Sequence, residues 1–261
     1  MNLDQKIITP YLEEKINVQN DPYLHAAIKD FLPIEIVKKA EEEFIDQKKT
    51  VDAGCRKFQK TKRVFEDLSQ MPPTIKKIIN FCYSQKFINL LERKFSLENV
   101  IPDWSLHGGG LHESYRGGFL KIHSDFIYVR HSKVKRILNL VLYLNSNWQK
   151  NWGGATELWD KKMKSVRKSV MPKINTAVVF EVGTNTFHGF PNPMNCPENV
   201  KRKSIALFYY KNVKKFLPIG LRRRKWYHSV FVKRPNIDEP KFGVDDSFFK
   251  RTKNRFFYRF Y

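Results

Sequence analysis

From Trp104 onward, the chain is a succession of short runs of β-branched, aromatic and leucine residues, separated by glycine, asparagine and proline. Connections such as 146–154 and 183–195 are rich in turn-forming residues. Short apolar runs between turn signals predict strands, and several of them in succession favour a β-sandwich or barrel over a βαβ fold. The expected strands are 118–123, 136–145, 155–159, 176–181 and 203–210.

The first hundred residues have a different pattern. Residues 32–48 place apolar side chains three and four positions apart, which predicts an amphipathic helix with Pro33 at its start. A second helical stretch is expected after Pro72 and Pro73, running through residues 75–91. The fold class predicted from both halves is mainly β with flanking helices. A domain over residues 1–215 is expected, with mainly helical support in 1–100 and the β core in 101–215.

The charge is concentrated near the end of the chain. The formal net charge is +22, and residues 211–261 hold 15 Lys and Arg against 4 Asp and Glu, a net of +11. Residues 216–261 are therefore expected to form a basic, aromatic extension beyond the domain. A second basic stretch, 161–173, lies between two expected strands. Such runs are either a solvated surface or a surface that attracts anions.

Composition also excludes several classes of protein. With 41% hydrophobic and 14% aromatic residues, the chain can form a packed core, which argues against general disorder. The longest apolar run, 137–144, is too short to span a bilayer, and the N-terminus shows no secretory signal. The cysteines are scattered and odd in number, which suits a reducing compartment. A cytoplasmic location is predicted. The cysteines are Cys55, Cys82 and Cys196.

Two common catalytic motifs are incomplete or absent in this sequence. The His107-Gly-Gly-Gly sequence is like a lipase oxyanion loop, but no G-x-S-x-G nucleophile follows it. A phosphate-binding loop of the G-x-x-x-x-G-K-[ST] type is absent as well. The cysteines lack the spacing of a zinc site. These chemistries are set aside.

One constellation of polar residues remains. His123 and Asp125 are two positions apart at the end of an expected strand, so both side chains can point to one centre. His188 follows a later strand and can supply a third ligand. Two imidazoles and one carboxylate on one side of a metal are typical of non-haem Fe(II) oxygenases. Arg202, which begins the last expected strand, can pair with a carboxylate of an anionic co-substrate.

Residues 104–211 resemble the Fe(II)/2-oxoglutarate-dependent dioxygenases, in particular their prolyl 4-hydroxylase-like branch. The matching pieces occur in the order of that family, and a weaker match extends to HSVFVKRP at 228–235. FLP at 31–33 is similar to the usual start of the fold. The pieces are GGFLKIHSD at 117–125, RILNLVLYLNSNW at 136–148, GGATELWD at 153–160, P-x-x-N-x-x-V-x-F at 172–180, FHGFP at 187–191 and RKSIALFYY at 202–210.

The resemblance implies a double-stranded β-helix, or jelly roll, in which His123, Asp125 and His188 hold Fe(II). It also implies that 2-oxoglutarate chelates the iron and that Arg202 pairs with its distal carboxylate. Tyr143 matches a position that often helps to bind this co-substrate. The cofactors implied are Fe(II), 2-oxoglutarate and O₂, with ascorbate as an optional reductant. Two weaker co-substrate candidates are Tyr115 and Ser204. Three histidines are taken as non-ligands: His107, His112 and His131.

The reaction implied is hydroxylation of an unactivated C–H with release of succinate and CO₂. Asp125 favours hydroxylation, because halogenating relatives have a small residue at this position. The family suggests a prolyl residue or a free amino acid as substrate, and small molecules or proteins stay open. The stretch 161–173 could steer an anionic substrate or an acidic protein. The sequence does not predict the oligomeric state.

Two alternatives stay open. One is a nucleic-acid oxygenase, since aromatic residues among the C-terminal cations could stack on bases. Against it, Phe208 stands where base-repairing relatives have a second arginine. The other is a jelly-roll binding module without catalysis. The aromatic residues in question are Trp226, Tyr227, Phe231, Phe248 and Phe249.

Overall fold

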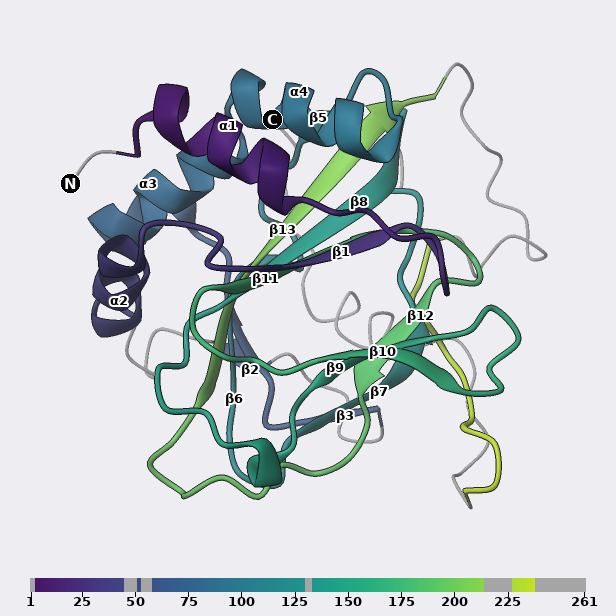
Figure 1. Ribbon diagram of the computed structural model, residues 1–261. Helices are drawn as coiled ribbons and strands as arrows, with labels where there is room; N and C mark the ends of the chain where they lie inside the picture. The colour runs from purple at the N-terminus through teal and green to yellow at the C-terminus, as the bar shows by residue number, and fades with distance from the viewer. Residues whose placement is uncertain (1–2, 45–50, 53–57, 130–132, 214–226, 238–261) are drawn as a thin grey trace, which may run out of the picture.

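Two antiparallel sheets face each other in the computed structural model, which describes residues 3–44, 51–52, 58–129, 133–213 and 227–237 (Figure 1). The fold is mainly β with flanking helices, as the sequence predicts, and the two sheets form a jelly-roll core. The larger sheet has the order β1 (His25–Lys29), β11 (Thr176–Glu181), β8 (Val134–Tyr143), β13 (Arg202–Asn212), β6 (Gly110–Ser114), β4 (Arg63–Phe65) and β2 (Val51–Asp52), with β5 (Ile101–Pro102) paired to β13. The smaller sheet has the order β10 (Val166–Val170), β9 (Thr156–Trp159), β12 (Phe187–Phe190), β7 (Phe119–Ser124) and β14 (Val230–Phe231), with β3 (Gln59–Lys60) paired to β7.

Helices cover the outer face of the larger sheet. They are α1 (Gln5–Lys15), α2 (Ile34–Glu42), α3 (Pro73–Cys82) and α4 (Gln85–Phe95). Their apolar residues join the leucines of β8 and the apolar residues of β13 in one hydrophobic cluster. Figure 1 shows these helices above the long strands of the larger sheet and the smaller sheet below those strands. One face of the larger sheet is therefore structural, and the opposite face is turned toward the second sheet.

The expected strands are confirmed, with ends that differ by one or two residues. The helix expected over 32–48 begins at Ile34 and is described to Glu42, and residues 45–48 lie outside the described part of the chain. The stretch after Pro73 forms two helices rather than one, because Ser84 caps a new helix by accepting a hydrogen bond from the Phe87 amide at 3.4 Å. Sequence reasoning missed α1 and the strands β1, β6, β10 and β12, among others.

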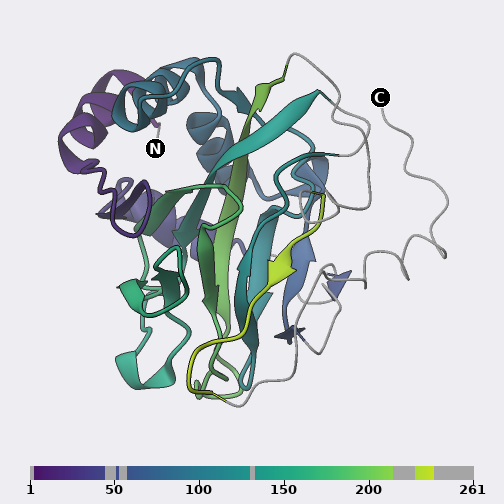
Figure 2. The same cartoon turned by 90° about the vertical axis from the view of Figure 1, so that its right-hand side faces the viewer.

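The C-terminal extension contributes to the smaller sheet. Val230 and Phe231 of β14 pair with Ser124 and His123 of β7, and Figure 2 shows this yellow strand beside β7. The boundary between 1–215 and 216–261 stays a prediction, but a short piece of the extension belongs to the sheet that carries the histidines. Residues 214–226 and 238–261 lie outside the described part.

Two further observations concern the cellular setting. Cys82 and Cys196 are buried free thiols, and Cys55 lies outside the described residues. None of the helices in the described ranges is long and apolar enough to cross a bilayer.

Candidate active site

The inner face of the larger sheet carries polar side chains at positions that alternate with the helix-facing ones. Along β8, Leu138, Leu140 and Leu142 lie in the helix-facing cluster, whereas Asn139 and Tyr143 point to the opposite side. On β13, Arg202 has the same parity as Ser204, which pairs with Tyr143. The period of two in a strand thus separates core packing from the residues that face the smaller sheet.

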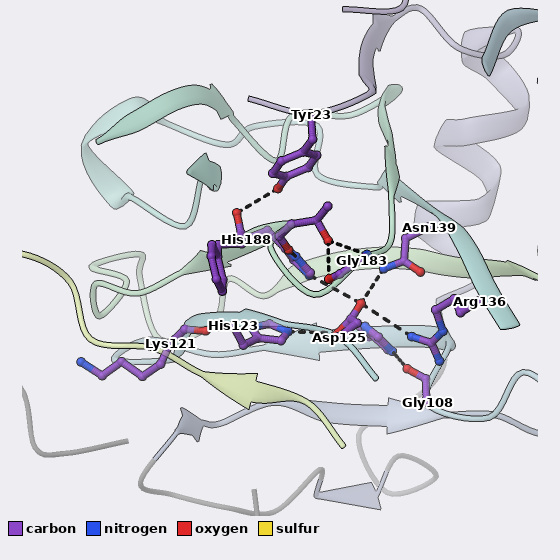
Figure 3. A network of polar contacts seen from close by, with 12 residues as sticks. Tyr23, Gly108, Lys121, His123, Asp125, Arg136, Asn139, Gly183 and His188 are labelled. Carbon is purple, nitrogen blue, oxygen red and sulfur yellow. Dashed lines mark hydrogen bonds and ion pairs between the residues drawn. The ribbon is translucent and has the colours of Figure 1, made fainter. Parts of the chain in front are cut away.

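His123, Asp125 and His188 meet between the two sheets (Figure 3). His123 lies directly opposite His188 in the pairing of β7 with β12, and Asp125 follows the end of β7. His123 Nε2 is 3.2 Å from Asp125 Oδ1, and His188 Nε2 is 3.6 Å from Asp125 Oδ2. Ligand atoms about 2 Å from a metal and at right angles lie about 3 Å apart. The three predicted ligands therefore converge at a spacing that suits a metal ion.

Backbone carbonyls orient both imidazoles. The Nδ1 atom of His123 is 2.8 Å from the Lys121 carbonyl, and Nδ1 of His188 is 3.3 Å from the Thr186 carbonyl. A carbonyl can only accept, so Nδ1 carries a hydrogen in each ring. Burial lowers the pKa of His188 to about 4, which keeps this ring neutral at pH 7 and leaves a lone pair on its Nε2. The backbone thus directs Nε2 of both rings to the Asp125 carboxylate.

Two residues that the sequence did not reveal hold the carboxylate of Asp125. Asn139 Nδ2 donates a hydrogen bond of 2.6 Å to Asp125 Oδ2, and Arg136 Nη1 lies 3.6 Å from the same oxygen (Figure 3). Burial alone would raise the pKa of Asp125, but the adjacent His188 and His123 and the Arg136 guanidinium hold it well below its usual range. Asp125 is therefore ionised and held in place for a cation.

A β-bulge directs Arg136 toward Asp125. Leu138 pairs with Tyr209 and Arg136 pairs with Tyr210, so one extra residue of β8 shifts the alternation. The guanidinium carbon of Arg136 lies 3.7 Å from the centre of the Phe208 ring and 3.8 Å from that of a second phenylalanine, Phe126. Arg136 is 1% exposed. No signal in the sequence marks this arginine, because both its burial and its direction depend on the bulge.

Arg202 lies apart from the three ligands, at the start of β13, and is buried. Its Nε donates to the Gly154 carbonyl at 2.9 Å and its Nη2 to Thr156 Oγ1 at 3.0 Å. Gly154 has φ +74°, a conformation that a side chain would strain, and this turns its carbonyl to Arg202. The ring of Phe190 lies 4.4 Å from the guanidinium carbon. Among the described residues, Nη1 has no hydrogen-bond partner, so it is available to a ligand.

Of the three other co-substrate candidates, Tyr143, Ser204 and Tyr115, the structure places the first two on the side of Arg202. Tyr143 Oη is 3.5 Å from Arg202 Nη2 and donates to Thr156 Oγ1 at 2.6 Å. Ser204 is buried on the same face, opposite Tyr143. Tyr115 is placed elsewhere, because its hydroxyl donates at 2.7 Å to Glu113, whose strand position faces the other side of β6 from Ser114. Thr156 was not foreseen, although it lies in the GGATELWD motif.

The C-terminal strand covers one metal-ligand candidate. Phe231 is 5% exposed, and its ring lies 5.1 Å from that of His123 and stacks on Phe58 at 4.3 Å. The interpretation of Phe231 as an aromatic residue free to stack on bases is therefore wrong, since packing against β7 buries it. Tyr227 lies 6.1 Å from the Tyr128 ring. Trp226, Phe248 and Phe249 lie outside the described residues.

Neither His107 nor His112, both expected to be non-ligands, belongs to the group of three ligands found among the described residues. His107 lies 3.8 Å from Glu66, and His131 is outside the described residues. His112 is on the inner face of β6, where its Nε2 is 3.1 Å from the Gly108 carbonyl. Burial, together with the charge of Lys62, lowers the pKa of His112 well below its usual value. His112 is thus neutral.

The donor set fits iron and 2-oxoglutarate. Two imidazoles and one ionised carboxylate converge on one position, which is the donor set that non-haem Fe(II) oxygenases use. Arg202 offers Nη1 to a carboxylate within the same space between the sheets. The fit to iron and 2-oxoglutarate thus follows from the types of these side chains and from the directions in which they point.

Comparison with known proteins agrees with this geometry. Residues 110–210 match the model of the 2OG-Fe(II) oxygenase superfamily. Over these residues the chain is similar to the 2OG-Fe(II) oxygenase superfamily. A search of curated protein sequences finds no match.

Solved structures share the fold of the oxygenase domain at low sequence identity. A prolyl hydroxylase from Trichoplax adhaerens, in complex with a hypoxia inducible factor peptide, is 13% identical with a TM-score of 0.50, covering 79% of this chain and 89% of that one. The viral collagen prolyl hydroxylase of Paramecium Bursaria Chlorella virus-1, in its 2OG complex, is 15% identical with a TM-score of 0.50, covering 74% and 98%. A 2OG-Fe(II) oxygenase family oxidoreductase from Burkholderia pseudomallei is 12% identical with a TM-score of 0.50, covering 82% and 94%.

The oxygenase superfamily uses Fe(II), 2-oxoglutarate and O₂, and the His-Asp-His group of such a site is present here. The cofactors expected from the sequence are thereby confirmed for the family, whereas ascorbate stays a prediction.

Proposed function

We propose that the chain is an Fe(II)- and 2-oxoglutarate-dependent hydroxylase whose metal ligands are His123, Asp125 and His188. The observation that carries this proposal is the convergence of the three ligand atoms, all within 4.8 Å of one another, with the ionised Asp125 between two imidazoles of fixed tautomer. Bound Fe(II), 2-oxoglutarate and O₂ supply the oxidising chemistry, in which one oxygen atom enters the substrate C–H and the other enters succinate, with release of CO₂.

The protein's own contribution is to position these groups. Asn139 and Arg136 fix the Asp125 carboxylate by a hydrogen bond and a charge contact. Arg202 binds the distal carboxylate of 2-oxoglutarate through Nη1, while its other nitrogens are held by Gly154 and Thr156. Tyr143 and Ser204 lie on the same face of the sheet as Arg202. Phe231 and Phe58 exclude water from one side of His123.

The proposed substrate is a prolyl residue or a free amino acid. The two prolyl hydroxylases that share the fold suggest the first, since one is in complex with a hypoxia inducible factor peptide and the other is a collagen prolyl hydroxylase. Retention of Asp125 as a metal ligand favours hydroxylation as the outcome. Peptides and small molecules both remain within this proposal.

The test is turnover of 2-oxoglutarate to succinate by the Fe(II)-loaded protein in the absence of a second substrate. The wild type should form succinate, while Asp125→Ala and Arg202→Ala should lose at least about 100-fold and 10-fold in kcat/KM for 2-oxoglutarate, respectively. Glu98→Ala is the control, since this exposed carboxylate lies outside the site. Equal turnover in all four proteins would reject the assigned residues, and no succinate in the wild type would favour a binding module without catalysis.

A further inference from the structure

One cation on the inner face is not explained by iron or by 2-oxoglutarate. Lys62 lies between β3 and β4, in a connection that joins the two sheets, because β3 pairs with β7 and β4 pairs with β6. Thr61 anchors this connection: its hydroxyl donates to the Tyr115 carbonyl at 3.2 Å and accepts from the Tyr115 amide at 3.0 Å. The backbone at Lys62 is therefore held in place on both sides, by a strand of the smaller sheet before it and a strand of the larger sheet after it.

The register of β4 and β6 places Lys62 on the inner face. Arg63 pairs with Glu113 and Val64 with His112, so continuing the ladder by one residue sets Lys62 beside Ser114. Ser114 in turn pairs with Arg202. Lys62 and Arg202 thus belong to one row across the sheet, two strands or roughly 10 Å apart, with side chains on the same face.

The environment of Lys62 is partly buried and contains other charges. Lys62 forms no hydrogen bond or ion pair with any residue in the described ranges. Burial lowers the pKa of Lys62 to about 8; the negative charges of Asp125 and Glu66 oppose this shift, and Arg202 and Arg136 add to it. An ammonium group in such a place is costly unless an anion accompanies it.

The sum of the charges on the inner face also indicates that an anion binds near Lys62. Once Fe(II) and the dianion of 2-oxoglutarate are bound, their charges cancel, and the inner face keeps Asp125 against Arg136, Arg202 and Lys62. Glu66 reduces the excess, but its carboxylate accepts the Gly108 amide at 3.0 Å and lies 3.8 Å from His107. An excess of at least one positive charge remains beside the site. A further anion would neutralise it.

We propose that Lys62 is a substrate-specificity residue that binds an anionic group, a carboxylate or a phosphate, of the primary substrate beside the metal centre. This proposal rests on the proposed function and narrows its substrate class. A free amino acid or a phosphorylated small molecule presents such a group next to a C–H bond, whereas the interior of an uncharged peptide does not. The overall charge of +22 would favour the approach of the same class of molecule.

The test uses the full chain loaded with Mn(II), which is redox-inert here, together with 2-oxoglutarate and inorganic phosphate as the anion probe. Phosphate held beside Mn(II) shows enhanced ³¹P relaxation, which gives a dissociation constant. Lys62→Met, which keeps most of the side-chain length, should weaken phosphate binding at least about tenfold. Lys60→Met is the matched control, because Lys60, the last residue of β3, is exposed, and its substitution should leave binding within about twofold of wild type.

The outcomes separate the two proposals. If wild-type protein binds no Mn(II) or no 2-oxoglutarate, the proposed function fails. If both bind but phosphate binding is absent, or is equal in wild type and Lys62→Met, the role of Lys62 is overturned. If phosphate and 2-oxoglutarate displace each other, or if Lys62→Met weakens 2-oxoglutarate more than phosphate, Lys62 serves the co-substrate instead and the proposal is equally overturned.

Discussion

The two faces of the larger sheet are made by the same strands but by different kinds of residue. On β8, Leu138, Leu140 and Leu142 pack against the helices, and the intervening Asn139 reaches the carboxylate of Asp125. Neighbouring residues in the sequence thus serve opposite sides of the sheet. The helix-facing side is apolar and closely packed, whereas the inner side holds buried hydrogen bonds and charges.

The outer face therefore contributes mainly to the stability of the fold, and the inner face holds the residues of the candidate site. Burial of apolar side chains on the outer face raises the free energy of unfolding. This contribution does not require a particular orientation of the buried groups, since the hydrophobic effect is non-directional. The inner face depends on the direction of single atoms, such as Asn139 Nδ2 and Arg202 Nη1. Substitutions on the two faces should therefore change different measurable quantities.

The largest effect is expected for stability on the outer face. Leu140 is fully buried, so Leu140→Ala should lower the free energy of unfolding by about 2–5 kcal/mol through lost burial and a cavity. Urea denaturation measures this change. The rate of succinate formation per folded molecule should stay at the wild-type value, and a fall in that rate would show that the faces are not independent.

The adjacent residue should behave in the opposite way. Asn139→Ala removes the hydrogen bond to Asp125 Oδ2 and should lower metal affinity or turnover about 10–100-fold. Its free energy of unfolding should change by less than about 1.5 kcal/mol. Fe(II) titration measures the metal affinity, and urea denaturation of the same sample measures the free energy of unfolding. A loss of stability matching that of Leu140→Ala, with normal metal affinity, would contradict the division of the faces.

The pH dependence of anion binding is a sharper test of the inner face. Lys62 has a pKa of about 8, so it is charged below pH 8 and becomes neutral as the pH rises through that value. Binding of dimethyl phosphate, whose charge is constant between about pH 6 and 10, should therefore weaken about tenfold from pH 7 to pH 9. Lys62→Met should bind weakly with no such slope. The same slope in this variant would assign the titration to another group.

The smallest effect is expected for a residue that holds the Arg202 side chain. Thr156→Val removes the hydroxyl that accepts from Arg202 and Tyr143 and should raise KM for 2-oxoglutarate about fivefold, the effect of one hydrogen bond of about 1 kcal/mol. Its kcat should change less than its KM. An unchanged KM would mean that Gly154 alone holds Arg202 in place.

Much of the fold was readable in the sequence because its strands carry strong local signals. The runs 136–145 and 176–181 are apolar, β-branched and bounded by turn residues, and both became central strands. β1 and β12 were missed because short segments such as HAAIK and FHGF form strands only by pairing with neighbours. Propensity cannot reveal a strand whose stability comes from its partner.

The three ligand candidates, Arg202 and the alternation of β8 could be predicted from the sequence, because each depends on local spacing or on a motif. The residues that surround them could be identified only in the folded chain. Arg136 reaches Asp125 through a bulge, Lys62 enters through the pairing of two short strands, and Phe231 returns from the C-terminal extension to cover His123. These positions depend on register and on contacts between distant segments. Such contacts are set by the packing of the whole chain rather than by any local run of residues.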